Sequence, residues 1–234
     1  MIRIGVTGTD TGVGKTVVSC ALASGLRRRG LRVAAMKPIE TGVAAEDPSR
    51  DGARLARAAG GPLPLSMLSP LVYPDPVAPL VAARRIGTTV DTALLDHAVK
   101  AVSNGADALV VEGAGGLLVP ITDRIAFDTL FSRWKLDAVV VAANRLGVIN
   151  HTRLTLAALR AADITISLVV LNTVSAETDT SSAENAKIIA ELENVSVVEL
   201  PWLPDAGDLE RASELLLEPV IHELERSGRP IAGR

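Results

Sequence analysis

Runs of apolar residues recur along the chain, and most of them are continuous instead of alternating with polar positions. Parallel strands that are covered on both faces of a sheet show this pattern, because both sides of each strand are buried. We therefore interpret six runs as buried strands, over Ile2–Thr7, Leu31–Met36, Ala108–Glu112, Ala138–Ala143, Ile164–Leu171 and Val195–Leu200.

The segments between these runs place apolar residues at helical spacing. They are Val17–Arg29, Gly52–Ala59, Thr92–Val102, His151–Ala162, Ala183–Leu192 and Leu209–Leu224. Strands that alternate with helices predict a doubly wound α/β fold, with a mostly parallel sheet and helices on both faces. In such folds ligands bind outside the carboxyl ends of the strands, so the strand ends are where functional residues are expected.

Two segments lack this periodicity. The proline-rich stretch Gly60–Pro79 is either a long surface excursion or a set of short elements, and the sequence leaves both possibilities open. The last residues, Ser227–Arg234, contain two glycines and a proline and are expected to fray. At 234 residues the chain fits one domain, which we place over residues 1–226.

The composition limits the ligands that the protein can bind. Aromatic residues make up only 2% of the chain, so few rings are present to stack on the bases of a single-stranded nucleic acid. The net charge of -3 gives no general attraction to polyanions. We therefore expect no nucleic-acid partner, and any phosphate recognition to be local, as for a small nucleotide.

Cysteine content and hydropathy bear on location. Cys20 is the only cysteine, so no internal disulfide is possible, and its place in a helical pattern predicts a buried thiol. The N-terminus turns polar from Thr7 onward, and no apolar run reaches the length that spans a bilayer. These features predict a cytoplasmic protein without a membrane partner.

The stretch Gly8–Thr16, GTDTGVGKT, directly follows the first predicted strand and opens the first predicted helix. Phosphate groups need many N–H donors at close range, so the loop needs glycines, a lysine for the phosphate charge and a hydroxyl for Mg²⁺. Gly12, Gly14, Lys15 and Thr16 supply these groups. The spacing departs from the strict G-x-x-x-x-G-K-[ST] pattern, which makes this a variant phosphate-binding loop.

Charged residues follow two further strands. Lys37 comes after the second strand, in KPIETG, and adds a second ammonium group near Lys15 unless it is an ordinary solvated lysine. Glu112 ends an apolar strand and precedes a glycine-rich turn, which is typical of a Walker-B-type carboxylate. Mg²⁺ commonly takes one or two carboxylates together with phosphate oxygens, so Glu112, Thr16 and Asp51 form a candidate site. For Asp51 the alternative is a carboxylate that only interacts with a helix N-terminus.

The turn RLGVINH at 145–151 offers free N–H groups to an anion such as a substrate carboxylate, or is an ordinary helix start capped by Asn150. Asn172 ends another apolar strand, and the run Pro201, Trp202, Leu203 follows the last one. These residues are candidates for the wall of a nucleobase site, although Asn172 alone also fits a turn.

Taken together, GTDTGVGKT, KPIETG, EGAGGLLVP, LGVINH, the Asn172 strand end and PWLPD resemble the dethiobiotin synthetase family, in order and spacing, over essentially the whole chain. The resemblance implies catalytic roles for Lys37, Lys15 and Thr11, and substrate contacts from Thr41. It implies a metal site of Thr16, Asp51 and Glu112, which bind Mg²⁺. The implied nucleotide-binding residues are Gly12, Val13, Gly14, Lys15, Thr16, Val17, Asp51, Glu112, Gly113, Ala114, Gly115, Asn172, Thr173, Pro201, Trp202 and Leu203.

The family's reaction, implied by the same resemblance, joins 7,8-diaminononanoate and CO₂ with ATP as co-substrate to give dethiobiotin, ADP and phosphate. The resemblance also implies a homodimer, in which a turn of one subunit meets the substrate carboxylate in the site of the other subunit. In this chain that turn carries Gly147, Val148, Ile149 and Asn150. Gly12 and Thr173 stand where some relatives have acidic residues, which leaves the preference for ATP over CTP or GTP open.

Three other functions compete. A partitioning or assembly switch ATPase of the ParA or MinD kind usually has an early lysine in its loop, where this chain has Asp10. A cobyrinate-type amidotransferase would need an attached glutaminase with a nucleophilic cysteine, for which this chain has no room. A non-catalytic binding module of the same fold remains the third alternative.

Overall fold

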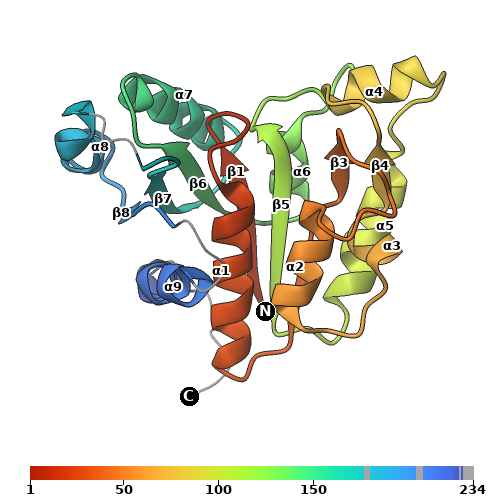
Figure 1. Cartoon of the computed structure of the whole chain (residues 1–234), viewed down its shortest axis with the longest axis horizontal. Helices are drawn as coiled ribbons and strands as arrows, with labels where there is room; N and C mark the ends of the chain where they lie inside the picture. The colour runs from red at the N-terminus through yellow and green to blue at the C-terminus, as the bar shows by residue number, and fades with distance from the viewer. Residues whose placement is uncertain (177–179, 204–207, 227, 229–234) are drawn as a thin grey trace.

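The computed structural model describes residues 1–176, 180–203, 208–226 and 228. Its main sheet has six strands in the order β2-β5-β1-β6-β7-β8, and every neighbouring pair is parallel. Figure 1 labels those from β5 to β8 in this order. The strands are β1 (Ile2–Gly8), β2 (Val33–Met36), β5 (Ala108–Gly116), β6 (Asp137–Ala143), β7 (Ile166–Asn172) and β8 (Val197–Leu200).

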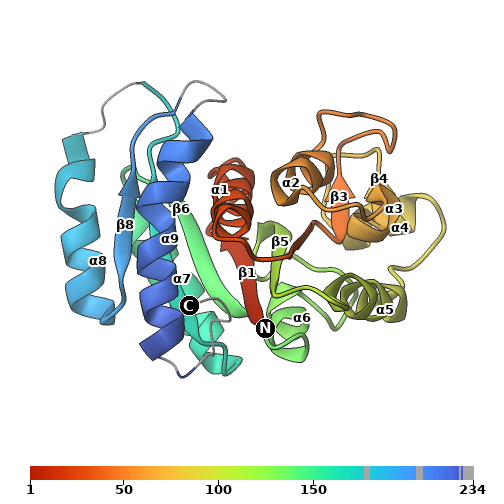
Figure 2. The same cartoon turned by 90° about the horizontal axis from the view of Figure 1, so that it is seen from below.

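Helices cover both faces of this sheet, as Figure 2 shows from below. One apolar core lies between the sheet and α1 (Lys15–Arg28), α2 (Asp51–Ala59) and α9 (Asp208–Arg226). The other core lies beneath α5 (Thr92–Ser103), α6 (Phe127–Arg133), α7 (Val148–Ala161) and α8 (Asn185–Glu193), which follows a short 3-10 turn, η1 (Thr180–Glu184). Successive residues of one strand serve opposite cores, as Val110 and Val111 of β5 do, which explains the continuous apolar runs.

The predicted doubly wound α/β fold is therefore confirmed. All six predicted strands and all six predicted helices are present, with boundaries displaced by a few residues. The sequence missed α6, because its seven residues are too few to show a helical period. The expected fraying of the tail falls on residues that lie outside the described part of the chain, apart from Gly228.

The ambiguous stretch Gly60–Pro79 is a set of short elements. It holds α3 (Leu65–Leu68) and β4 (Leu71–Tyr73), and α4 (Pro79–Arg85) begins at its end. Strand β4 pairs in parallel with β3 (Ile39–Thr41), so the two form a second sheet beside the main one. Elements of three or four residues are shorter than any usable hydropathy period, which is why the pattern could not resolve them.

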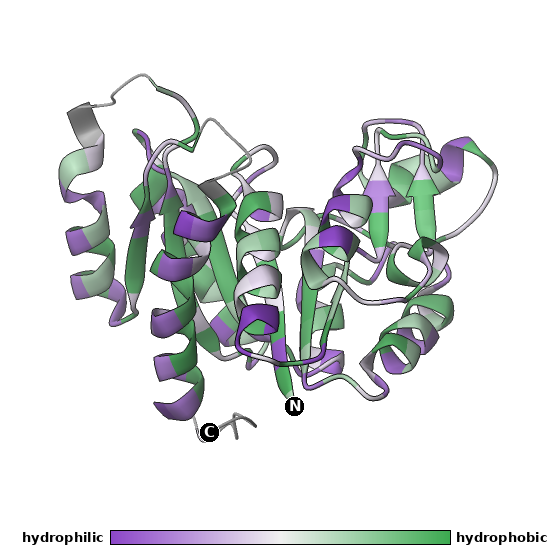
Figure 3. Cartoon of the chain, turned by 60° about the horizontal axis from the view of Figure 1, so that its bottom comes forward, coloured by the Kyte–Doolittle hydropathy of each residue, from purple (hydrophilic) through white to green (hydrophobic). Residues whose placement is uncertain are grey.

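Colouring by hydropathy shows the main strands and the inward faces of their helices as the apolar part of the molecule (Figure 3). Among the described residues, no helix combines the length and the apolar character needed to cross a lipid bilayer.

The contact between β1 and α6 leaves no room for a side chain at Gly5. A Cβ there would lie 2.5 Å from Cε2 of Phe131, whose ring is fully buried and meets Phe127 edge to face. The lack of a side chain at Gly5 thus allows α6 to lie close against the central strand.

We predict that Gly5→Ala lowers the free energy of unfolding by about 1–3 kcal/mol, since the added methyl group overpacks a closed core. Gly61→Ala is the matched control, because a Cβ at Gly61 would meet only a backbone oxygen at 3.7 Å. Urea unfolding of both variants measures the difference. Equal stability of the two variants would contradict the packing argument.

Candidate functional site

The phosphate-binding loop leaves the carboxyl end of β1 and enters α1. Gly14 is the residue that caps α1, at φ 96°, and Gly12 lies at φ 70°. Both values belong to the left-handed region that glycine adopts without strain. No side chain of the described residues caps α1, so its first-turn N–H groups face the site with the positive end of the helix dipole.

Lys15 turns back along this loop. Its Nζ donates a hydrogen bond to the backbone oxygen of Asp10 at 3.0 Å, and the side chain is largely buried. Burial, with a contribution from the like charge of Lys37, lowers the pKa of Lys15, although Glu112 acts in the opposite direction. A bound anion would compensate the desolvated charge, so this lysine is suited to phosphate.

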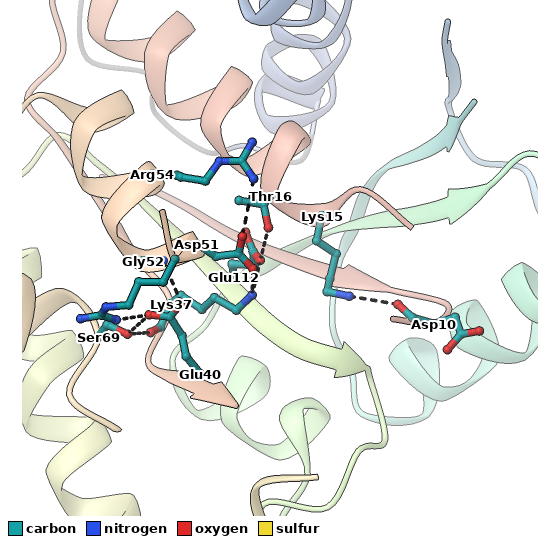
Figure 4. A network of polar contacts seen from close by, with 11 residues as sticks. Asp10, Lys15, Thr16, Lys37, Glu40, Asp51, Gly52, Arg54, Ser69 and Glu112 are labelled. Atoms are coloured by element: carbon teal, nitrogen blue, oxygen red, sulfur yellow. Dashed lines mark hydrogen bonds and ion pairs between the residues drawn. The ribbon is translucent and has the colours of Figure 1, made fainter. Parts of the chain in front are cut away.

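Lys37, at the end of β2, lies between two carboxylates. Its Nζ is 2.5 Å from Oδ2 of Asp51 and 2.8 Å from Oε1 of Glu112 (Figure 4). Burial alone would lower the pKa of Lys37, but Glu112 and Asp51 outweigh it and raise the pKa above the ordinary value. Lys37 is thus a buried, charged group and not a solvated surface lysine.

The same ammonium group acts on Asp51. Burial raises the pKa of that carboxyl, but the charge and hydrogen bond of Lys37 overcome burial and hold the pKa below its usual range. Asp51 is also the first residue of α2 and lies 3.7 Å from Nη1 of Arg54, so it is a helix-terminal charge and a member of the site at once.

Glu112 and Thr16 supply a place for a divalent cation. Oγ1 of Thr16 donates to Oε1 of Glu112 at 2.9 Å, while Oε2 of Glu112 is buried and has no hydrogen-bond partner among the described residues. The unpartnered Oε2 of Glu112, the hydroxyl of Thr16 and the carboxylate of Asp51 are all oxygen ligands, which is the kind of ligand that Mg²⁺ takes. Within the described residues, no group of three Asp, Glu, His or Cys side chains is arranged to hold a metal ion without other ligands, so phosphate oxygens and water would complete the ligand set.

These groups surround one cavity of about 390 Å³ at the carboxyl ends of β1, β2 and β5. The predicted residues that line it are Thr11, Gly12, Gly14, Lys15, Thr16, Val17, Lys37, Thr41, Asp51, Glu112, Ala114 and Gly115. Of the predicted residues in the phosphate-binding loop and the turn after Glu112, Val13 and Gly113 do not line it. Val13 is buried in the core, and Gly113 lies against Phe127.

Beneath Lys37 lies a buried polar cluster that sequence reasoning missed. Glu40 on β3 pairs with Arg50, accepts the N–H of Gly52 at 3.1 Å, and lies 2.5 Å from Oγ of Ser69. Arg54 also lines the cavity and was not predicted. A glutamate inside the KPIETG strand was the available signal for the cluster, but its partners are distant in sequence.

Asn172, at the end of β7, reaches the phosphate-binding loop without lining the cavity. Its Nδ2 donates to the backbone oxygen of Val13 at 3.0 Å, and a Cβ at Gly14 would lie 2.1 Å from the same atom. The N–H of Thr173 donates to the backbone oxygen of Leu200, which links the ends of β7 and β8. Pro201 and Leu203 are half-buried, Trp202 is 43% exposed, and their contacts with a base remain a prediction.

The turn before α7 differs from the prediction in one respect. Gly147, at φ 91°, caps the helix without a side-chain hydrogen bond from the described residues, so the alternative of capping by Asn150 was wrong. Because Gly147 adopts the left-handed conformation, α7 begins at Val148. The spacing of apolar residues predicts a helix that begins three residues later, at His151. Gly147, Val148, Ile149 and Asn150 do not line the cavity around Lys15.

A second cavity, of about 430 Å³, lies on the other side of the phosphate-binding loop. Leu118 and Leu154 line it and are 60% and 63% exposed. Its other lining residues are Thr9, Asp10, Gly116, Leu117, Val119, Pro120, Thr155 and Ala158. The loop therefore separates a charged cavity from a more apolar one.

Cys20 is buried in α1 as predicted, and burial raises the pKa of its thiol to about 12. A thiol that stays protonated does not act as a nucleophile at neutral pH.

Comparison with known proteins gives a family model described as an AAA domain, which matches residues 3–210. Proteins named ATP-dependent dethiobiotin synthetase BioD are similar over most of their length. The one from Anaeromyxobacter dehalogenans strain 2CP-C is 44% identical, covering 88% of this chain and 93% of the relative. The one from Bacillus cereus strain B4264 is 34% identical, covering 97% and 96%.

Among solved structures, a MinC:MinD cell division protein complex from Aquifex aeolicus superimposes with a TM-score of 0.53 at 16% identity. The match covers 100% of this chain and 99% of that one. At this identity the likeness concerns the fold alone.

The charge cluster predicts a pH-dependent stability. The folded state raises the pKa of Lys37 and lowers that of Asp51, so their pairing stabilises the fold above the ordinary pKa of aspartate, about 3.9, and below that of lysine, about 10.4. The contribution is lost as the pH falls through the lowered pKa of Asp51 or rises through the raised pKa of Lys37. We expect Lys37→Met to destabilise the protein by about 3–5 kcal/mol near pH 7, and by less at about pH 3, which lies below the ordinary pKa of aspartate, so that part of the contribution is already lost.

Urea unfolding at both pH values measures this difference, with Lys100→Met, at an exposed position, as the control. A loss of stability that is the same at both pH values would contradict the ion-pair interpretation of Lys37.

Proposed function

Because this chain belongs to the ATP-dependent dethiobiotin synthetase family, we propose that it closes the cyclic urea of dethiobiotin from 7,8-diaminononanoate, CO₂ and ATP, as a ligase of biotin biosynthesis. The observation that carries the proposal for this site is that Lys15, Lys37 and Glu112 meet at one cavity behind a phosphate-binding loop.

The chemistry calls for charge neutralisation more than for a protein nucleophile. One amine of the substrate takes up CO₂ as a carbamate, and a carbamate oxygen attacks the γ-phosphorus of ATP, which releases ADP. The second amine then attacks the carbonyl carbon of the mixed anhydride, phosphate leaves, and the ring closes. A carbamate and a triphosphate repel each other, so positioning and cationic groups supply most of the catalysis.

The two lysines have separable tasks in this scheme. Lys15, held over the loop, is placed to contact the terminal phosphates with the free N–H groups of α1. Lys37 lies deeper, is kept charged by its neighbours, and is placed to stabilise charge on the transferred phosphoryl group and the carbamate. Thr11 and Thr41 line the same cavity, and we assign them to the γ-phosphate side and to the diamine.

Thr16, Asp51 and Glu112 would hold Mg²⁺, which neutralises charge on the phosphate oxygens when bound. The unpartnered oxygen of Glu112 supports this assignment. So does the fact that the side chains of Asp51 and Thr16 line the same cavity as Glu112 (Figure 4). The nucleotide would continue from Gly12–Val17 toward Asn172, Thr173 and the residues 201–203.

The substrate carboxylate is assigned to a partner subunit. The N-terminal turn of α7, at Gly147–Asn150, offers uncapped N–H groups but does not line the cavity around Lys15 of its own chain. Exposed Leu154, on α7 itself, and exposed Leu118 line the cavity beside the phosphate-binding loop. A homodimer that covers these leucines would bring the α7 turn of one subunit to the substrate of the other.

The structure gives no support to the competing functions. A switch ATPase would need the early loop lysine, but Asp10 occupies that position and binds Lys15 through its backbone oxygen. An ammonia-producing amidotransferase would need a reactive cysteine, whereas Cys20 is buried with a raised pKa.

The reaction is tested by incubating the protein with the diamine, labelled bicarbonate and Mg²⁺, with each nucleoside triphosphate in turn. Label in a cyclic urea is the expected result, and the same series gives the base preference. Nucleotide-dependent binding to DNA or lipid, without labelled product, would favour the switch ATPase.

Lys37→Ala is expected to lower kcat by on the order of 10²-fold or more, since it removes a buried cation from the site of phosphoryl transfer. Lys100→Ala provides an exposed control. Near-normal turnover of the Lys37 variant would refute the role of this residue.

Leu154→Asp is expected to convert a dimer into a monomer and to lower activity, because a charge in an apolar interface is costly. Leu192→Asp, on α8 at 58% exposure, is the matched control. Sedimentation velocity gives the oligomeric state. A Leu154 variant that stays dimeric and active would contradict this interface.

A further inference from the structure

The buried cluster around Glu40 contacts the polypeptide on both sides of Asp51. The carboxylate of Glu40 pairs with the guanidinium of Arg50 and accepts the N–H of Gly52 at 3.1 Å. Glu40 and Arg50 are 2% and 5% exposed. Arg50 and Gly52, the residues before and after Asp51, therefore both contact the side chain of Glu40 on β3.

The cluster also reaches the backbone of Lys37. Oγ of Ser69 lies 2.8 Å from the backbone oxygen of Lys37 and 2.5 Å from Oε1 of Glu40. The hydroxyl has one proton, which it can donate to either oxygen, and its contact with both places Ser69 between Glu40 and the end of β2. Glu40 thus connects the two segments that present Lys37 and Asp51 to the cavity.

Glu40 further acts as a cap supplied from a distance. The residue before α2, Arg50, makes no side-chain cap of its own, and the N–H of Gly52 belongs to the first turn, where donors have no partner within the helix. A carboxylate from β3 satisfies this donor and interacts with the positive end of the helix dipole. A Cβ at Gly52 would lie 2.5 Å from Oε1 of Glu40, so the contact requires a glycine.

Stability alone is a weak reason for such an arrangement. A buried ion pair often stabilises a fold no better than apolar residues of the same volume, because both charges lose their hydration. The placement around Asp51 and Lys37 gives the pair a different use: groups behind a metal ligand fix its orientation, and their loss commonly weakens metal binding.

We propose that Glu40 is a positioning residue, which holds the first turn of α2 so that the carboxylate of Asp51 faces the divalent cation that binds with the nucleotide. The inference rests on the metal ligands assigned under the proposed function. Glu40 acts through the N–H of Gly52 and through Ser69. It lines the same cavity, but both of its oxygens are engaged by Arg50, Gly52 and Ser69, so we do not assign it as a ligand of the cation.

Two double variants separate the hydrogen bonds from the charge. Glu40→Gln with Arg50→Met removes both charges but keeps an acceptor for Gly52. Glu40→Met with Arg50→Met removes the acceptor as well. Neither variant leaves a buried charge unpaired, so both are expected to keep the fold.

The measurement is isothermal titration calorimetry with a non-hydrolysable ATP analogue, with and without Mg²⁺. The ratio of the two affinities reports the metal contribution independently of catalysis. We expect the Gln/Met variant to keep the wild-type ratio and the Met/Met variant to lose about tenfold or more of it. An unchanged ratio in the Met/Met variant, or an equal loss in both, would overturn the role of Glu40.

Gly52→Ala gives a second route if the Met/Met variant does not fold. Alanine favours the helix, but its Cβ would displace the contact with Glu40, so the ratio should fall, while Gly61→Ala should leave it unchanged. An unchanged ratio in Gly52→Ala would overturn the inference. A wild-type protein that shows no effect of Mg²⁺ would overturn the metal assignment of the proposed function along with it.

Discussion

The site depends on one buried interaction, the ammonium group of Lys37 between the carboxylates of Asp51 and Glu112. Each of these groups would be costly to bury alone, and together they keep a charged lysine at the floor of a cavity where anions are expected to bind. The strands that carry Lys37 and Glu112 are direct neighbours, so the sheet itself fixes two of the three partners. The third, Asp51, lies at the start of a helix and must be held by other contacts.

The two-stranded sheet contributes contacts on the side of Asp51. Strand β3 buries Ile39 in the apolar core, and it also brings Glu40 beneath Lys37 and next to the first turn of α2. Ser69, between α3 and β4, completes the link to the backbone of Lys37. Short elements with no usable hydropathy period thus supply contacts to the segments that carry the charged residues.

The loop between β1 and α1 divides the charged cavity from the more apolar one beside α7. In the proposed reaction the phosphates would lie on the first side. The exposed leucines of the second side would contact another copy of the chain. Because β1 lies between β5 and β6 at the centre of the sheet, the loop that follows it lines both cavities.

The sequence by itself determined the six strands of the main sheet and the six longer helices that alternate with them, because continuous apolar runs and helical spacing are local properties. It also determined the phosphate-binding loop and the candidates Lys37, Asp51 and Glu112, since each stands where a strand ends or a helix begins. Only the tertiary structure decided that these side chains meet, that Glu40 pairs with Arg50, and that Gly147 rather than Asn150 starts α7. Contacts between distant segments and the backbone angles of a glycine depend on packing, which no local pattern of residues encodes.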